Sequence, residues 1–277
     1  MTKSILTVLI PAYNSIEGII RVIDAIKLKK NVGVIVSDDS SDPAVANAIK
    51  AYITDFNRND YLYIKHESTG NAVDNWNFLL SQVKSKFFVI VHHDETFSNT
   101  LFIDEVEKCQ DLLEVMVLPI RIEHPNGVHR NVKSPAQSLL IKLFRTSSPA
   151  LNFIGGPTAL LIIKSTNIRS FNRDLVFYVD VDWYIKVFAD ISLNEIKIFP
   201  KTTILSSITN YSITKSIQQR MREVIISDIT ILKDYYPDNV FLKRSMIGAM
   251  LKFVYRLILV PSFAPYYLRR IKSFLLG

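Results

Sequence analysis

The chain opens with the apolar run Ile5-Leu6-Thr7-Val8-Leu9-Ile10, which ends in the turn-forming residues Pro11-Ala12-Tyr13-Asn14. A short run rich in Ile, Leu and Val, closed by a turn, is typical of a buried strand in a parallel sheet. Helix-length amphipathic stretches near 15–30, 43–57, 71–84 and 99–113 alternate with this and three similar runs: Val32 to Val36, Tyr61 to Ile64 and Phe87 to Val91. This βαβα order predicts an α/β fold, with a mostly parallel sheet covered by helices on both faces.

Length and composition fit a substantial folded core. The chain has 277 residues, 48% of them hydrophobic, so we do not expect disorder. Cys109 is the single cysteine, which excludes an intramolecular disulfide framework and favours a reducing compartment. Because the N-terminal residues lack the features of a signal peptide, we expect a cytoplasmic protein. The net charge of +7 favours an anionic partner: nucleic acid, nucleotide phosphates or an acidic lipid surface.

The second half of the chain continues the same domain. Ala159 to Ile163 and Glu195 to Phe199 predict strands, and Asp180 to Ile191 predicts a helix. Since no repeat or low-complexity linker intervenes, we assign residues 1–240 to one domain.

We expect residues 241–277 to form a helical extension, in which apolar residues are interleaved with Lys and Arg. Since it lacks an uncharged apolar stretch of about 18 residues, we do not expect it to span a membrane. Two interpretations stay open. The extension is either a basic amphipathic segment on an anionic membrane or a helix pair packed on the core.

Polar residues cluster where three predicted strands end. Pro11–Asn14 follow the first strand, Ser37–Asp42 the second and His92–Glu95 the fourth. Because ligands of open parallel sheets bind beyond the carboxyl ends of the strands, we expect these three segments to face one crevice. Carboxylates at such a place suit Mg²⁺ or Mn²⁺, which in turn binds a diphosphate, and Asp94 is the best candidate ligand.

Structural interpretations compete with each of these assignments. His92 and His93 could suggest Zn²⁺, but adjacent residues of an extended chain point to opposite faces, so we do not expect them to share an ion. The alternative is that one histidine packs against the core and the other forms a hydrogen bond in a turn. Asp38 and Asp39 could be turn residues, and Asp42-Pro43 could start a helix.

The order of the motifs resembles that of the family 2 glycosyltransferases, whose GT-A fold is a nucleotide-binding α/β sandwich. Leu6 to Asn14 is similar to the family's opening strand and Pro-Ala-Tyr-Asn turn. Asp38 to Asp42 is similar to its Asp-Asp-Gly-Ser-x-Asp segment, in which an aspartate contacts the base; here either Asp38 or Asp39 could take that role. The resemblance implies that a nucleotide-sugar donor contacts the following residues of these two segments: Pro11, Ala12, Tyr13, Asn14, Asp38 and Asp39.

Two further motifs extend the donor site. Gly70-Asn71-Ala72-Val73-Asp74-Asn75 resembles the family's Gly-Asn-x-x-x-Asn element, which implies that Gly70 and Asn75 lie near the nucleotide. A glycine turn followed by a helix cap is the structural alternative. The strand end at residues 92–95 resembles the family's Asp-x-Asp-Asp pattern. This implies that Asp94 binds Mn²⁺ or Mg²⁺ and that His93 lies at the donor.

The segment Phe177 to Val187 resembles the family's Glu-Asp segment, in which the aspartate is the catalytic base. The resemblance implies that Asp180 is this base, while Val179 replaces the glutamate. Asp182 is a weaker candidate, because residues two apart on a helix do not share a face. The structural alternative is that Asp180 is a helix N-cap.

The resemblance covers roughly residues 4–190. It implies an inverting glycosyltransferase that uses a glycan or lipid-linked acceptor in bacterial cell-surface polysaccharide synthesis, at the cytoplasmic face of the inner membrane. The alternative is a catalytically inactive glycosyltransferase-like protein that binds nucleotide or sugar, because His92, Glu95 and Val179 replace acids of the family pattern.

Three other classes are disfavoured. A sugar-nucleotide pyrophosphorylase would need a glycine-rich, basic phosphate loop after the first strand, and a dinucleotide dehydrogenase would need a Gly-x-Gly-x-x-Gly motif there. Residues 11–15 contain neither glycine nor charge. Nucleic-acid binding is disfavoured because the basic residues gather in an apolar C-terminal segment rather than along a polar, aromatic-studded groove.

Overall fold

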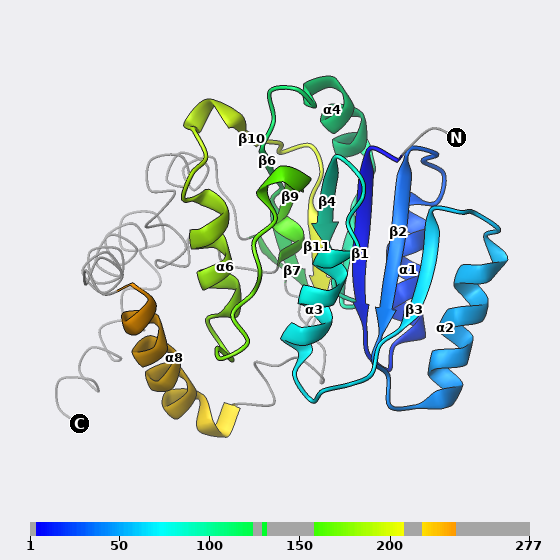
Figure 1. Cartoon of the computed structure of the whole chain (residues 1–277). Coiled ribbons are helices and arrows are strands. Elements are labelled where there is room, and N and C mark those ends of the chain that lie inside the picture. Colours follow the sequence, from blue (N-terminus) through cyan, green and yellow to red (C-terminus); the bar gives the residue numbers. More distant parts are fainter. Residues whose placement is uncertain (1–3, 124–128, 132–157, 208–217, 237–277) are drawn as a thin grey trace.

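The computed structural model describes residues 4–123, 129–131, 158–207 and 218–236 (Figure 1). Its main sheet has seven strands in the order β10-β6-β9-β4-β1-β2-β3. β9 runs antiparallel to β4 and β6, and the other neighbouring strands are parallel. The predicted α/β fold with a mostly parallel sheet is confirmed. The strands are β1 (Leu6–Ala12), β2 (Val32–Asp38), β3 (Tyr61–Lys65), β4 (Phe87–Ile90), β6 (Val115–Val117), β9 (Leu161–Lys164) and β10 (Ile196–Ile198).

A smaller four-stranded sheet has the order β5-β11-β7-β8. β11 is parallel to β7 and antiparallel to β5. Since β5 begins at Glu95, directly after the strand end at residues 92–94, the small sheet starts where the candidate site lies. Its strands are β5 (Glu95–Phe97), β7 (Ile120–Glu123), β8 (His129–Asn131) and β11 (Ile204–Ser207).

Helices cover both faces of the main sheet, with α1 behind it and α3 in front (Figure 1). α2 begins at Pro43 because the Asp42 side chain accepts a hydrogen bond from the backbone of Ala44, so the predicted helix start is confirmed. The α-helices are α1 (Ile16–Ile26), α2 (Pro43–Asp55), α3 (Ala72–Ser81), α4 (Leu101–Cys109), α6 (Val179–Phe188) and α8 (Met221–Tyr235). The 3₁₀ turns are η1 (Thr158–Leu160), η2 (Ser165–Asn167), η3 (Leu193–Glu195) and η4 (Gln218–Arg220).

The connections locate the place where a ligand would bind. From β1 the chain moves outward to β2 and β3 and then returns to β4 on the other side of β1. Strand order therefore reverses between β1 and β4. In open α/β sheets ligands bind beyond the carboxyl ends of the strands at such a switch point. The segments that leave those ends begin at Tyr13 after β1 and at Val91 after β4.

Several elements differ from the sequence predictions, and β5, β6, β7, β8 and β11 were not predicted. η1 occupies the start of the predicted strand at 159–163, so β9 begins at Leu161. α6 ends at Phe188 rather than at Ile191. α8 was not predicted, although Val224, Ile225, Ile231 and Leu232 have the spacing of one helical face.

The C-terminal extension at 241–277 lies outside the described residues. Within the described part of the chain, every helix is too short or too polar to cross a bilayer.

Candidate active site

The loop after β1 is tied to the loop after β2 through Asn14. Its backbone N–H donates to Ser40 Oγ at 2.8 Å, and its amide Nδ2 donates to Ser41 Oγ at 3.0 Å. Its Oδ1 accepts from the backbone of Asp42 at 3.2 Å. Asn14 adopts a left-handed conformation (φ 48°), which Asn tolerates better than most residues. The donor-site motifs at the ends of β1 and β2 thus form one unit, with Pro11 and Ala12 buried in β1 and Tyr13 45% exposed.

Asp38 and Asp39 have different environments. Asp38 is fully buried: its Oδ1 accepts from the Ser40 backbone at 2.9 Å, and its Oδ2 accepts from the Tyr63 hydroxyl at 2.8 Å. The Lys65 ammonium lies 3.7 Å from Oδ2. Asp39 is only half-buried, and burial raises the pKa of its carboxyl. Asp38 is therefore engaged in holding the loop, which leaves Asp39 as the carboxylate that can meet a ligand.

Two residues that interact with Asp39, His66 and Asn75, each carry a buried polar atom without a partner among the described residues. Burial raises the pKa of the Asp39 carboxyl overall, and the interactions with His66 and Asn75 offset part of this rise. Among the described residues, His66 Nδ1 and Asn75 Oδ1 are buried atoms without a hydrogen-bond partner. Asn75 Nδ2 donates to the Ser37 carbonyl at 3.1 Å, which orients the amide. Buried polar atoms are normally paired, so these two atoms fit a polar ligand at this place.

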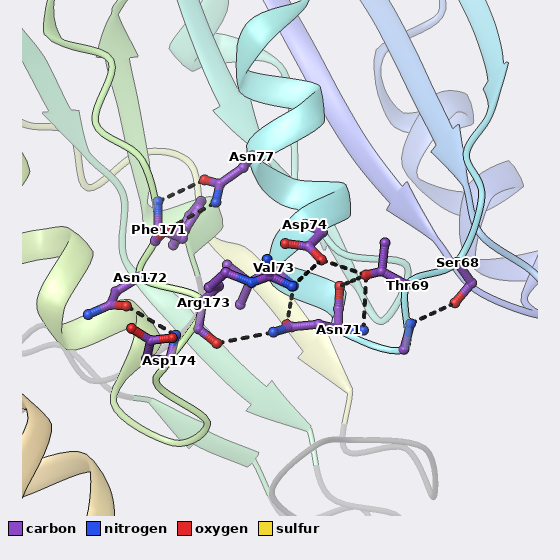
Figure 2. Close-up of polar contacts among 11 residues, drawn as sticks. Ser68, Thr69, Asn71, Val73, Asp74, Asn77, Phe171, Asn172, Arg173 and Asp174 are labelled. Atoms are coloured by element: carbon purple, nitrogen blue, oxygen red, sulfur yellow. Dashed lines mark hydrogen bonds and ion pairs between the residues drawn. The ribbon is translucent and has the colours of Figure 1, made fainter.

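The Gly70 element forms a turn and a cap. Gly70 has φ 77°, and Asn71 Oδ1 accepts from the Val73 backbone at 3.0 Å to cap α3. The cap also bridges to the segment before α6, because Asn71 Nδ2 donates to the Arg173 carbonyl at 3.1 Å and the Arg173 guanidinium pairs with Asp74 at 3.1 Å (Figure 2). The structural interpretation of this motif is therefore confirmed, and the helix it starts is fastened to residues 171–174.

Asn77, one turn further along α3, strengthens this junction. Its Oδ1 accepts from the Phe171 backbone at 2.8 Å and its Nδ2 donates to the Phe171 carbonyl at 3.1 Å (Figure 2). The Phe171 ring lies between Trp76 and Trp183, with ring centroids 5.3 Å and 4.7 Å away. Helix α3 and the segment that leads to α6 are thus joined by both hydrogen bonds and aromatic packing.

His92 and Glu95, which replace acids of the family pattern, bond within the protein. His92 Nε2 lies 3.1 Å from Thr158 Oγ1, and its ring meets Trp76 edge-on at 4.9 Å. Burial lowers the pKa of His92 to about 4, so the imidazole is neutral near pH 7. Glu95 is 1% exposed, accepts from the His92 backbone at 2.9 Å, and has its pKa raised by burial. The alternative in which one histidine packs inside the protein instead of binding a metal is thus confirmed for His92.

The backbone at His93 and Asp94 is held between α1 and β11. The His93 carbonyl accepts from the Arg21 guanidinium at 3.2 Å and lies against Gly18. The Asp94 carbonyl accepts from the Ser207 backbone at 2.9 Å. These contacts fix the chain on both sides of the Asp94 side chain, which is half-buried.

Asp180 is the second residue of α6. The N-cap position belongs to Tyr178, so the interpretation of Asp180 as an N-cap is wrong. Burial raises the pKa of the Asp180 carboxyl to about 7. The charge of Asp180 also raises the pKa of Glu95, and both carboxylates add to the effect of burial in raising the pKa of Tyr184. The start of α6 therefore lies within electrostatic range of the strand end that carries Asp94.

Asp182 has a structural role. Its side chain is fully buried, accepts from the Tyr236 hydroxyl at 2.8 Å and pairs with the Lys186 ammonium at 2.6 Å. Oδ1 is thereby hydrogen-bonded, while Oδ2 has no hydrogen bond and is held by the ion pair alone, and these contacts argue against Asp182 as the base.

The sequence profile of glycosyl transferase family 2 matches residues 7–185. The chain belongs to this family. The match includes every predicted site residue from Pro11 to Asp180, and α8 lies beyond its end. Among curated proteins none matches the chain.

Solved glycosyltransferases share the fold of this family 2 chain. The mannosyltransferase PcManGT from Pyrobaculum calidifontis, in complex with GDP-Man and Mn²⁺, is 13% identical with a TM-score of 0.57, covering 99% of this chain and 81% of that one. S. aureus TarS 1-349, in complex with UDP-GlcNAc, is 16% identical with a TM-score of 0.56. The match covers 76% of this chain and 60% of that one. GalNAc-T7 with UDP, GalNAc and Mn²⁺ is 12% identical with a TM-score of 0.54, covering 73% and 44%.

These likenesses confirm the GT-A type of α/β fold. The matched part spans only 60% of TarS 1-349 and 44% of GalNAc-T7.

A divalent metal would need help from a donor to bind here. Within the described part of the chain, no three His, Cys, Asp or Glu side chains converge as a metal-binding group. Mg²⁺ is commonly held by one or two carboxylates together with substrate phosphates, and Mn²⁺ takes the same oxygen ligands. The single carboxylate of Asp94, on a backbone fixed at the switch point, fits an ion of this kind.

Proposed function

We propose that the chain is an inverting glycosyltransferase that moves a sugar from a nucleotide-sugar donor to a hydroxyl of a glycan or lipid-linked acceptor. The observation that supports the proposal is that Asp180 and Glu95 lie within electrostatic range of each other, so the start of α6 lies near the strand end that carries Asp94. The two segments are 85 residues apart in sequence (180 − 95). Their meeting at the switch point of the sheet unites an acid–base group with a candidate ion site.

The donor would bind along the carboxyl ends of β1, β2 and β4. Asp39 faces the base, since Asp38 is engaged with Tyr63 and Ser40, and the unpaired atoms of His66 and Asn75 supply further polar contacts. Asp94 would hold Mn²⁺ or Mg²⁺, which supplies positive charge against the leaving diphosphate.

Asp180 would act as the general base. Its carboxylate takes the proton of the acceptor hydroxyl while the hydroxyl oxygen bonds to the anomeric carbon. The bond from that carbon to the diphosphate oxygen breaks, and its electron pair leaves with the nucleoside diphosphate. A single displacement inverts the anomeric centre. A pKa of about 7 suits this role, since a base works best when its pKa lies near the working pH.

A panel of nucleotide sugars, with product masses measured, tests the proposal. We expect one donor to give a product whose mass is increased by one sugar residue. Asp180→Asn should lower turnover by about 10²–10⁴-fold and leave nucleotide affinity unchanged. Asp190→Asn is the matched control, because Asp190 follows α6 and its exposed carboxylate pairs only at the surface, with Arg169 at 3.2 Å. Undiminished turnover of Asp180→Asn would reject the base assignment. Donor binding without any transfer would favour the inactive binding protein.

The setting that we propose is bacterial cell-surface polysaccharide synthesis at the cytoplasmic face of the inner membrane, with residues 241–277 on the anionic lipid surface. The basic charge of these residues supports it. Co-sedimentation with anionic vesicles should be lost when the chain is cut near residue 240, and undiminished binding of the cut chain would remove that role from the extension.

A further inference from the structure

A buried carboxylate lies on α8, outside the segment that the family profile matches. Asp228 is 1% exposed, although its neighbours in sequence on either side are at least partly exposed. Asp228 and Leu232 are spaced four residues apart and so lie on one face of α8, and Tyr236 is the C-cap residue that follows the helix. Leu232 is fully buried in the core, so this face packs against the domain. A charge is rarely buried unless it is paired or hydrogen-bonded, so its partners indicate its role.

The partners of Asp228 are the backbone N–H groups that lead into α6. Its carboxylate accepts from Val176 at 3.2 Å, from Phe177 at 2.7 Å and from Tyr178 at 2.7 Å. Backbone N–H groups at the start of a helix have no partner within the helix, and a negative charge there also complements the helix dipole. The carboxylate thus holds residues 176–178, the last of which lies two positions before Asp180.

A second contact, from the C-cap residue of α8, holds α6 after Asp180. The Tyr236 hydroxyl donates to Asp182 Oδ1 at 2.8 Å, and Asp182 also pairs with Lys186 one turn along α6. Figure 1 shows α8 beside α6. The first turn of α6 is therefore fastened on both sides of Asp180: by Asp228 at residues 176–178 and by Tyr236 at Asp182.

We propose that Asp228 is a positioning residue, which sets the place of the Asp180 carboxylate by binding the backbone N–H groups of residues 176–178. This inference rests on the proposed function, in which Asp180 is the base. Asp228 contacts neither the loops after β1 and β2 nor the strand end at Asp94 by any hydrogen bond of the described residues. Its loss should therefore affect the proton transfer and leave donor binding intact.

Asp228→Asn tests the proposal, because asparagine keeps the size of the side chain but loses the charge and one acceptor oxygen. We expect kcat to fall by about 10²-fold, since a displacement of about 1 Å at a reacting group has that effect. The Kd of the nucleoside diphosphate, measured by calorimetry with UDP and with GDP, should not change. Asp234→Asn is the matched control on the same helix, because Asp234 is exposed.

A double variant separates positioning from general stability. If Asp228 acts through Asp180, adding Asp228→Asn to Asp180→Asn should lower the residual rate little further, because groups that act as a unit are not additive. If the role of Asp228 is purely structural, Asp228→Asn should lower kcat by the same factor in wild type and in Asp180→Asn. Hydrogen exchange at the amides of residues 176–178 should also be faster in Asp228→Asn than in Asp234→Asn.

Three results would overturn the positioning role: full turnover of Asp228→Asn, an equal loss in both backgrounds, or weakened nucleotide binding. If Asp228→Asn does not fold, Asp228→Glu keeps the charge with a longer side chain, and the same kcat loss at unchanged Kd is expected. A wild-type chain that transfers no sugar from any donor would instead refute the proposed function, and with it the catalytic meaning of Asp228.

Discussion

Gly18 in α1 packs against the carbonyl oxygen of His93, and a Cβ atom at Gly18 would lie 2.1 Å from that oxygen. Arg21, further along the same helix, donates a hydrogen bond to the same carbonyl at 3.2 Å. The backbone beside Asp94 is therefore seated on α1, and only a residue without a side chain permits this distance. Sequence analysis did not single out Gly18, because a glycine inside an amphipathic helix carries no local signal of what lies opposite.

Gly18→Ala should therefore disturb the site as well as the fold. We expect a loss of about 1–3 kcal/mol in the free energy of unfolding, because the added methyl group pushes α1 away from His93. Nucleotide affinity in the presence of Mn²⁺ should fall with it. Gly70→Asn is the control for the unfolding measurement alone, because the family resemblance places Gly70 near the nucleotide: Gly70 has φ 77° with no atom within 4 Å of its Cβ position, and asparagine tolerates this conformation. If denaturant unfolding showed the same loss in the free energy of unfolding for Gly18→Ala and Gly70→Asn, the close contact at Gly18 would be contradicted.

Asp94→Ala should abolish the effect of metal on donor binding. Calorimetric titration of wild type with a nucleoside diphosphate should show tighter binding with Mn²⁺ than without it, since the ion is shared between carboxylate and phosphates. In Asp94→Ala the two affinities should be equal. Asp55→Ala is the control, because Asp55 is exposed at the end of α2. An unchanged Mn²⁺ effect in Asp94→Ala would assign the ion to other residues.

Asp38 and Asp39 should respond in opposite ways to replacement by alanine. Asp38→Ala leaves the Tyr63 hydroxyl and the Ser40 N–H without their buried acceptor, and each unpaired group costs about 1–3 kcal/mol of stability. Asp39→Ala should change the free energy of unfolding little and weaken nucleotide binding. Thermal unfolding and calorimetry on both variants decide the matter. The reverse pattern would make Asp38 the residue that contacts the base.

Transfer should depend on pH through Asp180. A general base acts only in its deprotonated form, and burial raises the pKa of Asp180 to about 7. The kcat/KM for the acceptor should therefore rise with pH from about 5 to about 8, with a midpoint near 7, because this parameter reports the free enzyme. Asp180→Asn should abolish this rise in its residual rate. A flat profile in wild type would show that another group takes the proton.

The same shift in the pKa of Asp180 has a consequence for stability. The folded state holds the proton more tightly than the unfolded chain, so this contribution to the free energy of unfolding is present at low pH and is lost as the pH rises through about 7.

Local patterns in the sequence determined the framework of this protein. The four N-terminal strands, the helices between them and the cap at Asp42 were predicted because side-chain periodicity and turn chemistry act over a few neighbouring residues. The order of the motifs predicted the family, and the place of the site followed from the rule that ligands bind where strand order reverses. Helix ends were less accurate, since capping groups decide them.

Tertiary structure alone decided which of the polar residues are available for chemistry. Asp38 differs from Asp39 because its partner Tyr63 comes from the neighbouring strand 25 residues later in the chain. Asp228 reaches Tyr178 across 50 residues. A carboxylate in a sequence is the same group whether it will be buried and bonded or left free. Its partners are brought by the packing of distant elements, so only the folded chain separates the residues that hold the site from those that can react in it.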